Sequence, residues 1–282
     1  MKGEQAIRLA RERAGRAREE AAHAAVKAAG RGVAAGLPRL LQLLAPGGVH
    51  RAWSAALLSR VVSAVRVLGD GASTAWGASL LRTLPGARAA GLGDADAVLA
   101  ALDRAHLGAR WARLWAGVRP PAPARAPVAL LPSPGYREAL ATRAWEGLRG
   151  VPAGTPLAQA RPLVARAVKD AAASLAWVPV RDARYLASSE YNRAVVDGLR
   201  RHDRPGSRVY KRLVATHDKR TGKDSLVLDG QTVPLDQPFQ DFWYGGTYDH
   251  PPNRLNDREV VTPWRDLWGA PPRTPARARR PS

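Results

Sequence analysis

A short stretch in the last third of the chain collects side chains that could take part in a reaction. His217 and Asp218 are adjacent, Arg220 and Ser225 follow within eight residues, and Glu190 precedes them on a predicted helix. These groups suit a toxin-like hydrolase or transferase, which is one hypothesis. Catalysis needs a base within hydrogen-bond reach of a nucleophile, and neighbours in sequence do not establish this. No known catalytic spacing is present, so we favour an architectural role over an enzyme.

The same stretch carries the signals of a small β-structure. Residues 208–215 (RVYKRLVA) have the β-branched and aromatic content of a strand, and residues 226–233 (LVLDGQTV) are two apolar runs joined by Asp229 and Gly230. An Asp-Gly pair is typical of a type I′ turn, in which both central residues take positive φ. We therefore predict a hairpin at 226–233, with the pair at 238–239 anchoring the strand exit in the core.

Polar residues near the predicted hairpin are expected to maintain the fold. Arg220 lies between Asp218 and Asp224, where it is well placed for a charge-assisted hydrogen bond. Thr221 and Asn256 supply side-chain oxygens that can satisfy turn amides. These residues need no substrate to explain their presence.

Three segments in residues 183–264 match a set of short sequence motifs in order. They read ARYLASSEYNRA, DKRTGKDSLVLDGQTVPLDQPF and PPNRLNDREVV. They match a short E-x-N helix signature, a D-x-R-T turn, an L-D-G turn, a closing P-F and the N and R of an N-C-R-C ending, at Glu190, Asn192, Asp218, Arg220, Thr221, Leu228, Asp229, Gly230, Pro238, Phe239, Asn256 and Arg258. In this order and spacing they resemble the phage Mu F-like minor head (head morphogenesis) protein family.

This chain departs from the family pattern at the positions where the family has cysteine or histidine. Asp257 and Glu259 replace the two cysteines of N-C-R-C, and Ser225 stands where a His or Cys is expected. In the family these positions resemble a metal-ligand set. The resemblance therefore implies the scaffold without metal or cofactor, and a hard cation held by these three oxygen-bearing residues is the less favoured alternative. The chain has no cysteine, which excludes a disulfide framework and a thiolate site.

Helices must position these residues, and the sequence predicts a mainly α protein with a small C-terminal α+β domain. The helix predicted for residues 4–29 has a narrow alanine seam, and we expect Gly30, Gly32 and Gly36 to end it. Apolar spacing predicts further helices around 53–68, 98–115, 136–148, 157–176 and 182–199. Tryptophans 53, 111 and 115 are interpreted as core residues.

Proline content divides this series of helices. Residues 119–135 (RPPAPARAPVALLPSPG) hold six prolines, which favours a linker or an extended strap over a helix. The predicted organisation is a basic helical region at 1–118, the strap at 119–135, a Mu F-like α+β domain at 136–268 and a basic disordered tail at 269–282.

Charge indicates the partner class. The net charge is +20, with 22 Lys+Arg against 10 Asp+Glu in residues 1–150 but 11 against 10 in residues 201–268. Such an excess attracts polyanions, although a genome that favours Arg codons is an alternative source. No base-reading motif is present, so contact with DNA is expected to be non-specific. The candidate contacts are Arg8, Arg11, Arg13, Arg16, Arg18, Lys27, Arg273, Arg277, Arg279 and Arg280.

Taken with the resemblance, these features predict a minor capsid protein at the portal vertex or inner capsid surface, acting in head assembly, DNA retention or ejection. Expected partners are the portal or major capsid protein and double-stranded DNA, with no membrane and no small-molecule substrate. The expected location is the virion, and the host cytoplasm during assembly. A protein that only binds or condenses DNA is a second alternative. The first 30 residues lack the apolar core of a secretory signal.

Overall fold

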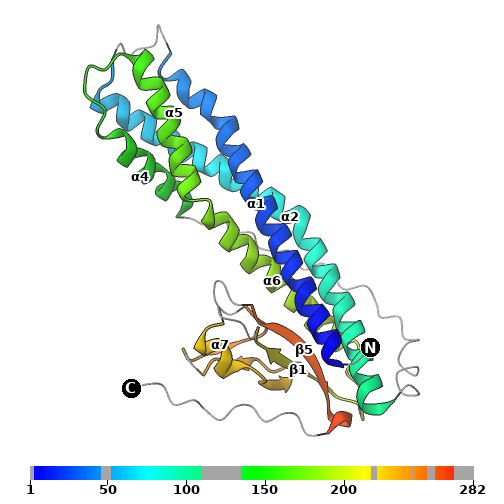
Figure 1. Ribbon diagram of the computed structural model, residues 1–282. Helices are drawn as coiled ribbons and strands as arrows, with labels where there is room; N and C mark the ends of the chain where they lie inside the picture. The colour runs from blue at the N-terminus through cyan, green and yellow to red at the C-terminus, as the bar shows by residue number, and fades with distance from the viewer. Residues whose placement is uncertain are drawn as a thin grey trace. The chain divides into compact units, whose positions relative to one another are not determined.

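The computed structural model describes residues 3–45, 52–108, 135–216, 221–242, 244–252 and 258–269. The protein is mainly helical with a small antiparallel sheet near its C-terminal end, as the sequence predicts (Figure 1). The helices are α1 (Gly3–Gln42), α2 (Ala55–Leu107), α4 (Tyr136–Leu148), α5 (Leu157–Ser174), α6 (Trp177–Arg200), α7 (Lys223–Leu228) and the 3-10 turn η1 (Asp266–Trp268). The strands are β1 (Val209–Val214), β2 (Thr232–Pro234), β3 (Phe239–Gln240), β4 (Thr247–Tyr248) and β5 (Val260–Arg265).

The chain forms two compact units, neither of which is continuous in sequence. Unit 1 comprises Met1–Glu20, Leu84–Pro127 and Arg184–Ser282, and unit 2 comprises Ala21–Thr83 and Val128–Ala183. Helices α1, α2 and α6 each contribute residues to both units. Most of the predicted strap at 119–135, and the tail beyond residue 269, lie outside the described residues.

Unit 2 is an all-helical bundle. Leu37, Leu57, Val61 and Leu140 are buried in it. Trp76 of α2 and Tyr136 at the start of α4 pack edge to face with ring centroids 4.9 Å apart. Two backbone hydrogen bonds join Trp53, ahead of α2, to the turn between α4 and α5: its N–H donates to Thr155 O, and its carbonyl accepts from Gly154 N. The helices predicted at 136–148 and 157–176 are confirmed within two residues.

The predicted end of the first helix at Gly30, Gly32 and Gly36 is wrong, because α1 continues to Gln42. A Cβ on Gly32 would lie 2.7 Å from the Cα of Ala72 in α2, a distance that side chains do not tolerate. Glycine here allows α1 and α2 to approach closely. Close packing of the two helices offsets the cost of about 1 kcal/mol that an interior glycine carries.

The stretch predicted at 53–68 and the described part of the one predicted at 98–115 fall almost entirely in one helix, α2, which runs from Ala55 to Leu107. Leu68, Ala72, Trp76 and Leu80 are buried at helical spacing through its middle. Burial of this stripe outweighs the local penalties of the helix's interior glycines and of Pro85. The predicted core tryptophans 111 and 115 lie outside the described residues, and Trp53 is buried as predicted.

Unit 1 combines a three-stranded antiparallel sheet, ordered β2-β1-β5, with helical segments (Figure 1). Val209 of β1 pairs with Arg265 of β5, and Val214 with Val260, so the two strands match along their full length. The strand predicted at 208–215 and the helix at 182–199 are confirmed. The core joins helical residues to strand residues: Ala14, Ala95, Tyr191, Val195, Leu199, Val209, Leu213, Phe239 and Val261.

The hairpin predicted at 226–233 is wrong, because the first apolar run ends helix α7. Asp229 has φ −58° and ψ 135°, Gly230 has φ +81°, and Gln231 N donates to Leu228 O at 3.2 Å. These values define a type II turn, which requires positive φ only at its third residue. The requirement for glycine at 230 therefore holds, whereas the predicted positive φ at Asp229 does not.

Candidate functional site

Asn192 of the predicted helix signature joins α6 to β5. Its Nδ2 donates to Ser188 O at 3.0 Å and to Glu259 O at 3.1 Å, and its Oδ1 accepts from Val261 N at 2.8 Å. The side chain is 1% exposed. A side-chain amide is neutral and can both donate to and accept from backbone groups at the edge of a strand. Asn192 therefore fixes the position of β5 against α6.

The L-D-G turn is tied to the end of β1. Asp229 Oδ1 accepts from Ala215 N at 2.7 Å, and Gly230 N donates to Leu213 O at 2.9 Å. Arg258, from the N-C-R-C position, contributes its carbonyl, which accepts from Thr216 Oγ1 at 2.9 Å. The structure thus brings the second and third motif elements together at the end of β1: Asp229 bonds there through its carboxylate, and Arg258 through its backbone carbonyl.

The closing P-F pair lies where the sequence predicts. Phe239 is fully buried beside Tyr248, with ring centroids 5.6 Å apart, and Pro238 is half-buried next to it. The ammonium of Lys211 lies 5.1 Å from the Phe239 ring centre and donates to Asp249 O at 2.7 Å. Burial lowers the pKa of Lys211 below its usual value. Sequence reasoning missed Lys211, which stands at a core position of β1.

Other predicted residues fall outside the described part of the chain, namely His217, Asp218, Arg220, Asn256 and Asp257. Thr221 is half-buried and Ser225 is buried within α7, where its backbone N–H donates to Asp224 Oδ1. The enzyme hypothesis, which needs His217, Asp218 and Arg220, stays a hypothesis. In the described ranges no group of three or more His, Asp or Glu side chains is arranged to hold a metal ion.

Glu190, the other helix-signature residue, faces arginines rather than a nucleophile. One carboxylate oxygen accepts from Arg193, and the other lies 3.8 Å from Arg88 Nη1. Arg88 Nη2 also donates to Asp197 Oδ2 at 3.0 Å. The carboxylates of α6 and the guanidinium of α2 thus form a chain of ion pairs within unit 1.

Glu259, at the second cysteine position of the family motif, is 4% exposed. Among the described residues neither carboxylate oxygen has a hydrogen-bond partner, while the residue's backbone carbonyl accepts from Asn192. A buried polar group without a partner costs about 1–3 kcal/mol. Within the described residues, the backbone carbonyl of Glu259 has a clear structural role in its bond to Asn192.

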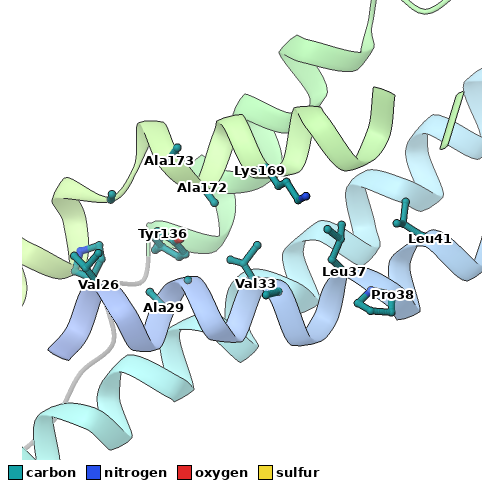
Figure 2. Close-up of a pocket in the computed structure, with 14 residues that line it drawn as sticks. Val26, Ala29, Val33, Leu37, Pro38, Leu41, Tyr136, Lys169, Ala172 and Ala173 are labelled. Carbon is teal, nitrogen blue, oxygen red and sulfur yellow. The ribbon is translucent and has the colours of Figure 1, made fainter. Parts of the chain in front are cut away.

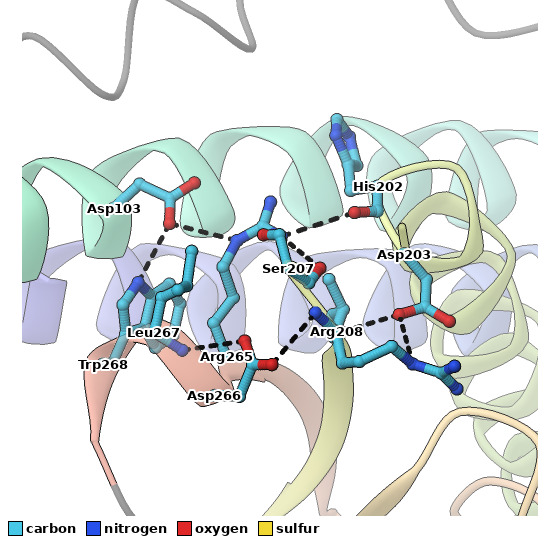
Figure 3. A network of polar contacts seen from close by, with 10 residues as sticks. Asp103, His202, Asp203, Ser207, Arg208, Arg265, Asp266, Leu267 and Trp268 are labelled. Atoms are coloured by element: carbon cyan, nitrogen blue, oxygen red, sulfur yellow. Dashed lines mark hydrogen bonds and ion pairs between the residues drawn. The ribbon is translucent and has the colours of Figure 1, made fainter. Parts of the chain in front are cut away.

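A fully buried ion pair joins α2 to the end of β5 (Figure 3). Arg265 Nε donates to Asp103 Oδ1 at 3.1 Å, and the indole N–H of Trp268 donates to the same oxygen at 2.9 Å. Arg265 Nη1 donates to Ser207 Oγ at 2.7 Å. Burial raises the pKa of Asp103, which Arg265 opposes, and lowers that of Arg265. Sequence reasoning missed this network, whose partners are up to 165 residues apart.

A second buried group lies between α1, α2 and α6. Tyr191 OH donates to Asp94 Oδ2 at 2.6 Å, and Arg13 Nε lies 2.8 Å from Asp94 Oδ1. Burial raises the pKa of both Asp94 and Tyr191 above their usual values. Asp94 is 1% exposed, so its charge needs a partner inside the protein. Arg13, which the sequence suggested as a DNA contact, serves mainly as the counter-ion of Asp94.

The predicted DNA contacts on α1 divide into two groups. The first group is engaged within the protein. Arg11 donates to Ala215 O at 3.0 Å, and burial lowers its pKa. Arg13 pairs with Asp94, and Arg18 is half-buried and interacts with other residues of the chain. Arg8, Arg16 and Lys27 are exposed, and Arg8 lies 3.8 Å from Glu12. The tail candidates Arg273, Arg277, Arg279 and Arg280 lie outside the described residues.

Charge is divided unequally between the units. Counted over described residues, unit 1 has 18 Lys+Arg against 17 Asp+Glu, whereas unit 2 has 13 against 5. The excess of the described part therefore belongs to unit 2, which contains only Lys27 among the predicted contacts.

A polar pocket of about 590 Å³ opens in unit 1 between α6 and the β3-β4 region. It is lined by Tyr185 and Ser189 of α6 and by Asp241, Tyr248 and His250. Burial lowers the pKa of His250, whose Nδ1 lies 3.2 Å from Pro251 O. No nucleophile paired with an oriented base is found among its described lining residues.

Comparison with protein-family models, with curated proteins and with solved structures finds no significant match. No helix in the described ranges combines the length and the apolar character needed to cross a bilayer.

Proposed function

We propose that this protein is a minor head protein of a phage-type virion, built on a Mu F-like module and acting in head assembly, DNA retention or ejection. The observation that supports this most is Asn192, whose side chain makes three hydrogen bonds to backbone atoms of α6, of β5 and of the residue just before β5. A motif residue used in this way belongs to a scaffold. Asp229 supports the same interpretation through its bond to Ala215 N.

The second part of the proposal is non-specific contact with packaged double-stranded DNA. It is supported by the net charge of +20 and by the exposed basic residues of unit 2. Phosphate contacts need positive charge and no base-reading geometry. The near-neutral unit 1 is correspondingly proposed to dock on the portal or major capsid protein.

Particle composition tests the location. Particles purified from the source, treated with DNase and protease and then dissociated, should contain this chain at a fixed copy number relative to the major capsid protein. A chain that is removed by the protease treatment, or found only in the unassembled fraction, contradicts a place inside the head.

DNA binding tests the second part. The full chain should bind two unrelated labelled duplexes with equal affinity, and log Kd should change linearly with log salt concentration. Reversal of charge at Arg277, Arg279 and Arg280 should weaken binding and reduce the salt slope by up to about 3 if all three contact phosphates. A preference for one duplex, or an affinity independent of salt, would contradict the proposal.

A further inference from the structure

An apolar groove of about 550 Å³ runs along α1 in unit 2 (Figure 2). Val26, Val33, Leu37 and Leu41 line one wall, and the facing wall contains Ala172 and Ala173. Of the fourteen lining residues, only Lys169 carries a charge, so the floor is not a surface for phosphates or sugars.

The dimensions of the groove fit an α-helix. The lining of α1 extends from Val26 to Leu41, which corresponds to about 22 Å at the rise of a helix. Alanine and glycine make up much of the lining, so a helix backbone can approach closely. Large side chains at i, i+3, i+4 and i+7 of a partner would enter between the walls.

Both rims are basic. On α1, Lys27, Arg31 and Ala34 are spaced by four and three residues and so lie on one side of the helix. Ala34 is an exposed residue of the groove lining, so the two cations lie along that edge of the groove. On α5, Arg166 and Lys169 precede Ala173 in the same way. All four cations are exposed, and none forms an ion pair with a described residue.

The acids of unit 2 do not neutralise these rims. Among its described residues, Asp70, Glu138, Glu146 and Asp182 lie within ion-pair distance of arginines outside the four rim cations. Asp170 on α5 is the remaining one, and it pairs with neither Arg166 nor Lys169. The groove therefore presents an apolar floor between two positive edges.

We propose that this groove binds an amphipathic helix of a partner protein, about four turns long, with an apolar face flanked by Asp and Glu. Charge complementarity selects this occupant. Unit 2 of a second copy, with 13 Lys+Arg against 5 Asp+Glu among its described residues, or another basic segment would place cations against cations. The apolar floor distinguishes a protein partner from DNA, because phosphate contacts gain nothing from buried leucine and valine. The inference does not depend on the proposed function.

The test uses the full chain and a labelled peptide of about 18 residues, whose helix has leucines on one face and glutamates beside them. Fluorescence anisotropy should show saturable binding. A peptide with Lys for each Glu should bind at least about tenfold more weakly. A peptide of the same composition with the leucines dispersed around the helix should not bind. Equal binding of all three peptides, or none by the first, would overturn the proposal.

Variants locate the site. Ala173→Phe fills the groove from an exposed position, and Arg166→Glu with Lys169→Glu reverses one rim; each should weaken binding of the Glu peptide by about tenfold or more. Arg82→Glu, an exposed charge reversal on α2 outside the groove lining, is the control and should bind as the parent does. Unchanged binding by Ala173→Phe would contradict the assignment. If duplex DNA competes with the peptide, and still binds the Ala173→Phe variant as it binds the parent, the rims would be assigned to DNA instead.

Discussion

The two units differ in what lies inside them. Of the fifteen buried polar or charged residues of the described chain, thirteen belong to unit 1, and unit 2 contains only Ser73 and Ser79. Unit 1 is nearly neutral and pairs its charges internally, whereas unit 2 keeps an apolar interior and carries its excess cations outside. Buried polar groups tie distant segments into one arrangement only while all partners are present. Unit 1 should therefore be sensitive to single polar changes, and unit 2 to changes of volume.

Loss of the buried arginine of unit 1 should produce the largest effect. Arg265→Ala leaves Asp103 buried without its counter-ion, and we expect the free energy of unfolding to fall by about 3–5 kcal/mol. Urea unfolding followed by circular dichroism measures this. Arg143→Ala, which breaks an exposed pair with Glu146, is the control and should cost less than about 1 kcal/mol.

A paired replacement sharpens that result. Arg265→Met combined with Asp103→Leu removes both charges, so no ion is left buried, and it should recover most of the lost stability. If the double variant is as unstable as Arg265→Ala, packing rather than the uncompensated carboxylate explains the loss.

Unit 2 should respond instead to added volume. Gly32→Ala places a methyl 2.7 Å from the backbone of Ala72, so α1 and α2 must separate, at a cost of about 1–3 kcal/mol. Gly77→Ala in α2 meets no atom within 4 Å and should raise the free energy of unfolding by about 0.5–1 kcal/mol. The same urea titration compares them. Equal effects in the two variants would mean that close approach at Gly32 does not matter.

Gly32 and Arg265 also show how much of the fold could be predicted from the sequence. Periodic apolar spacing located α4, α5 and α6, and β-branched and aromatic content located β1, because each of these signals is local in the sequence. It failed at Gly32, where a contact with α2 decides that the helix continues. The pair Arg265 and Asp103 has no local pattern, because 162 residues separate its members. Asn192 was found only as part of a resemblance, and Asp229 was found also from the Asp-Gly turn signal, but the bonds of both residues to backbone became visible only in the fold.

The turn at residue 230 tests the motif itself. Gly230→Val forces a β-branched residue to φ +81°, and we expect a loss of about 1–3 kcal/mol from backbone strain. The nearest atom to an added Cβ is 3.8 Å away, so the Cβ itself meets ordinary van der Waals contact and the strain comes from the backbone. Gly230→Asn should cost less, since asparagine tolerates positive φ. A Val variant as stable as the Asn variant would contradict a left-handed requirement.

The smallest expected effect is a change in pH dependence. Burial raises the pKa of Asp94 above its usual value, which is about 3.8 in the unfolded chain. The folded state therefore holds that proton more tightly, and its contribution to stability falls as pH rises through the interval above 3.8. Asp94→Asn keeps an oxygen for Tyr191 and removes the titration. The parent's stability relative to Asp94→Asn, from urea midpoints at about pH 4 and above, should therefore decrease with rising pH. An increase would mean that the ion pair with Arg13 outweighs the desolvation of Asp94, and that this buried carboxylate is stabilised chiefly as an ion.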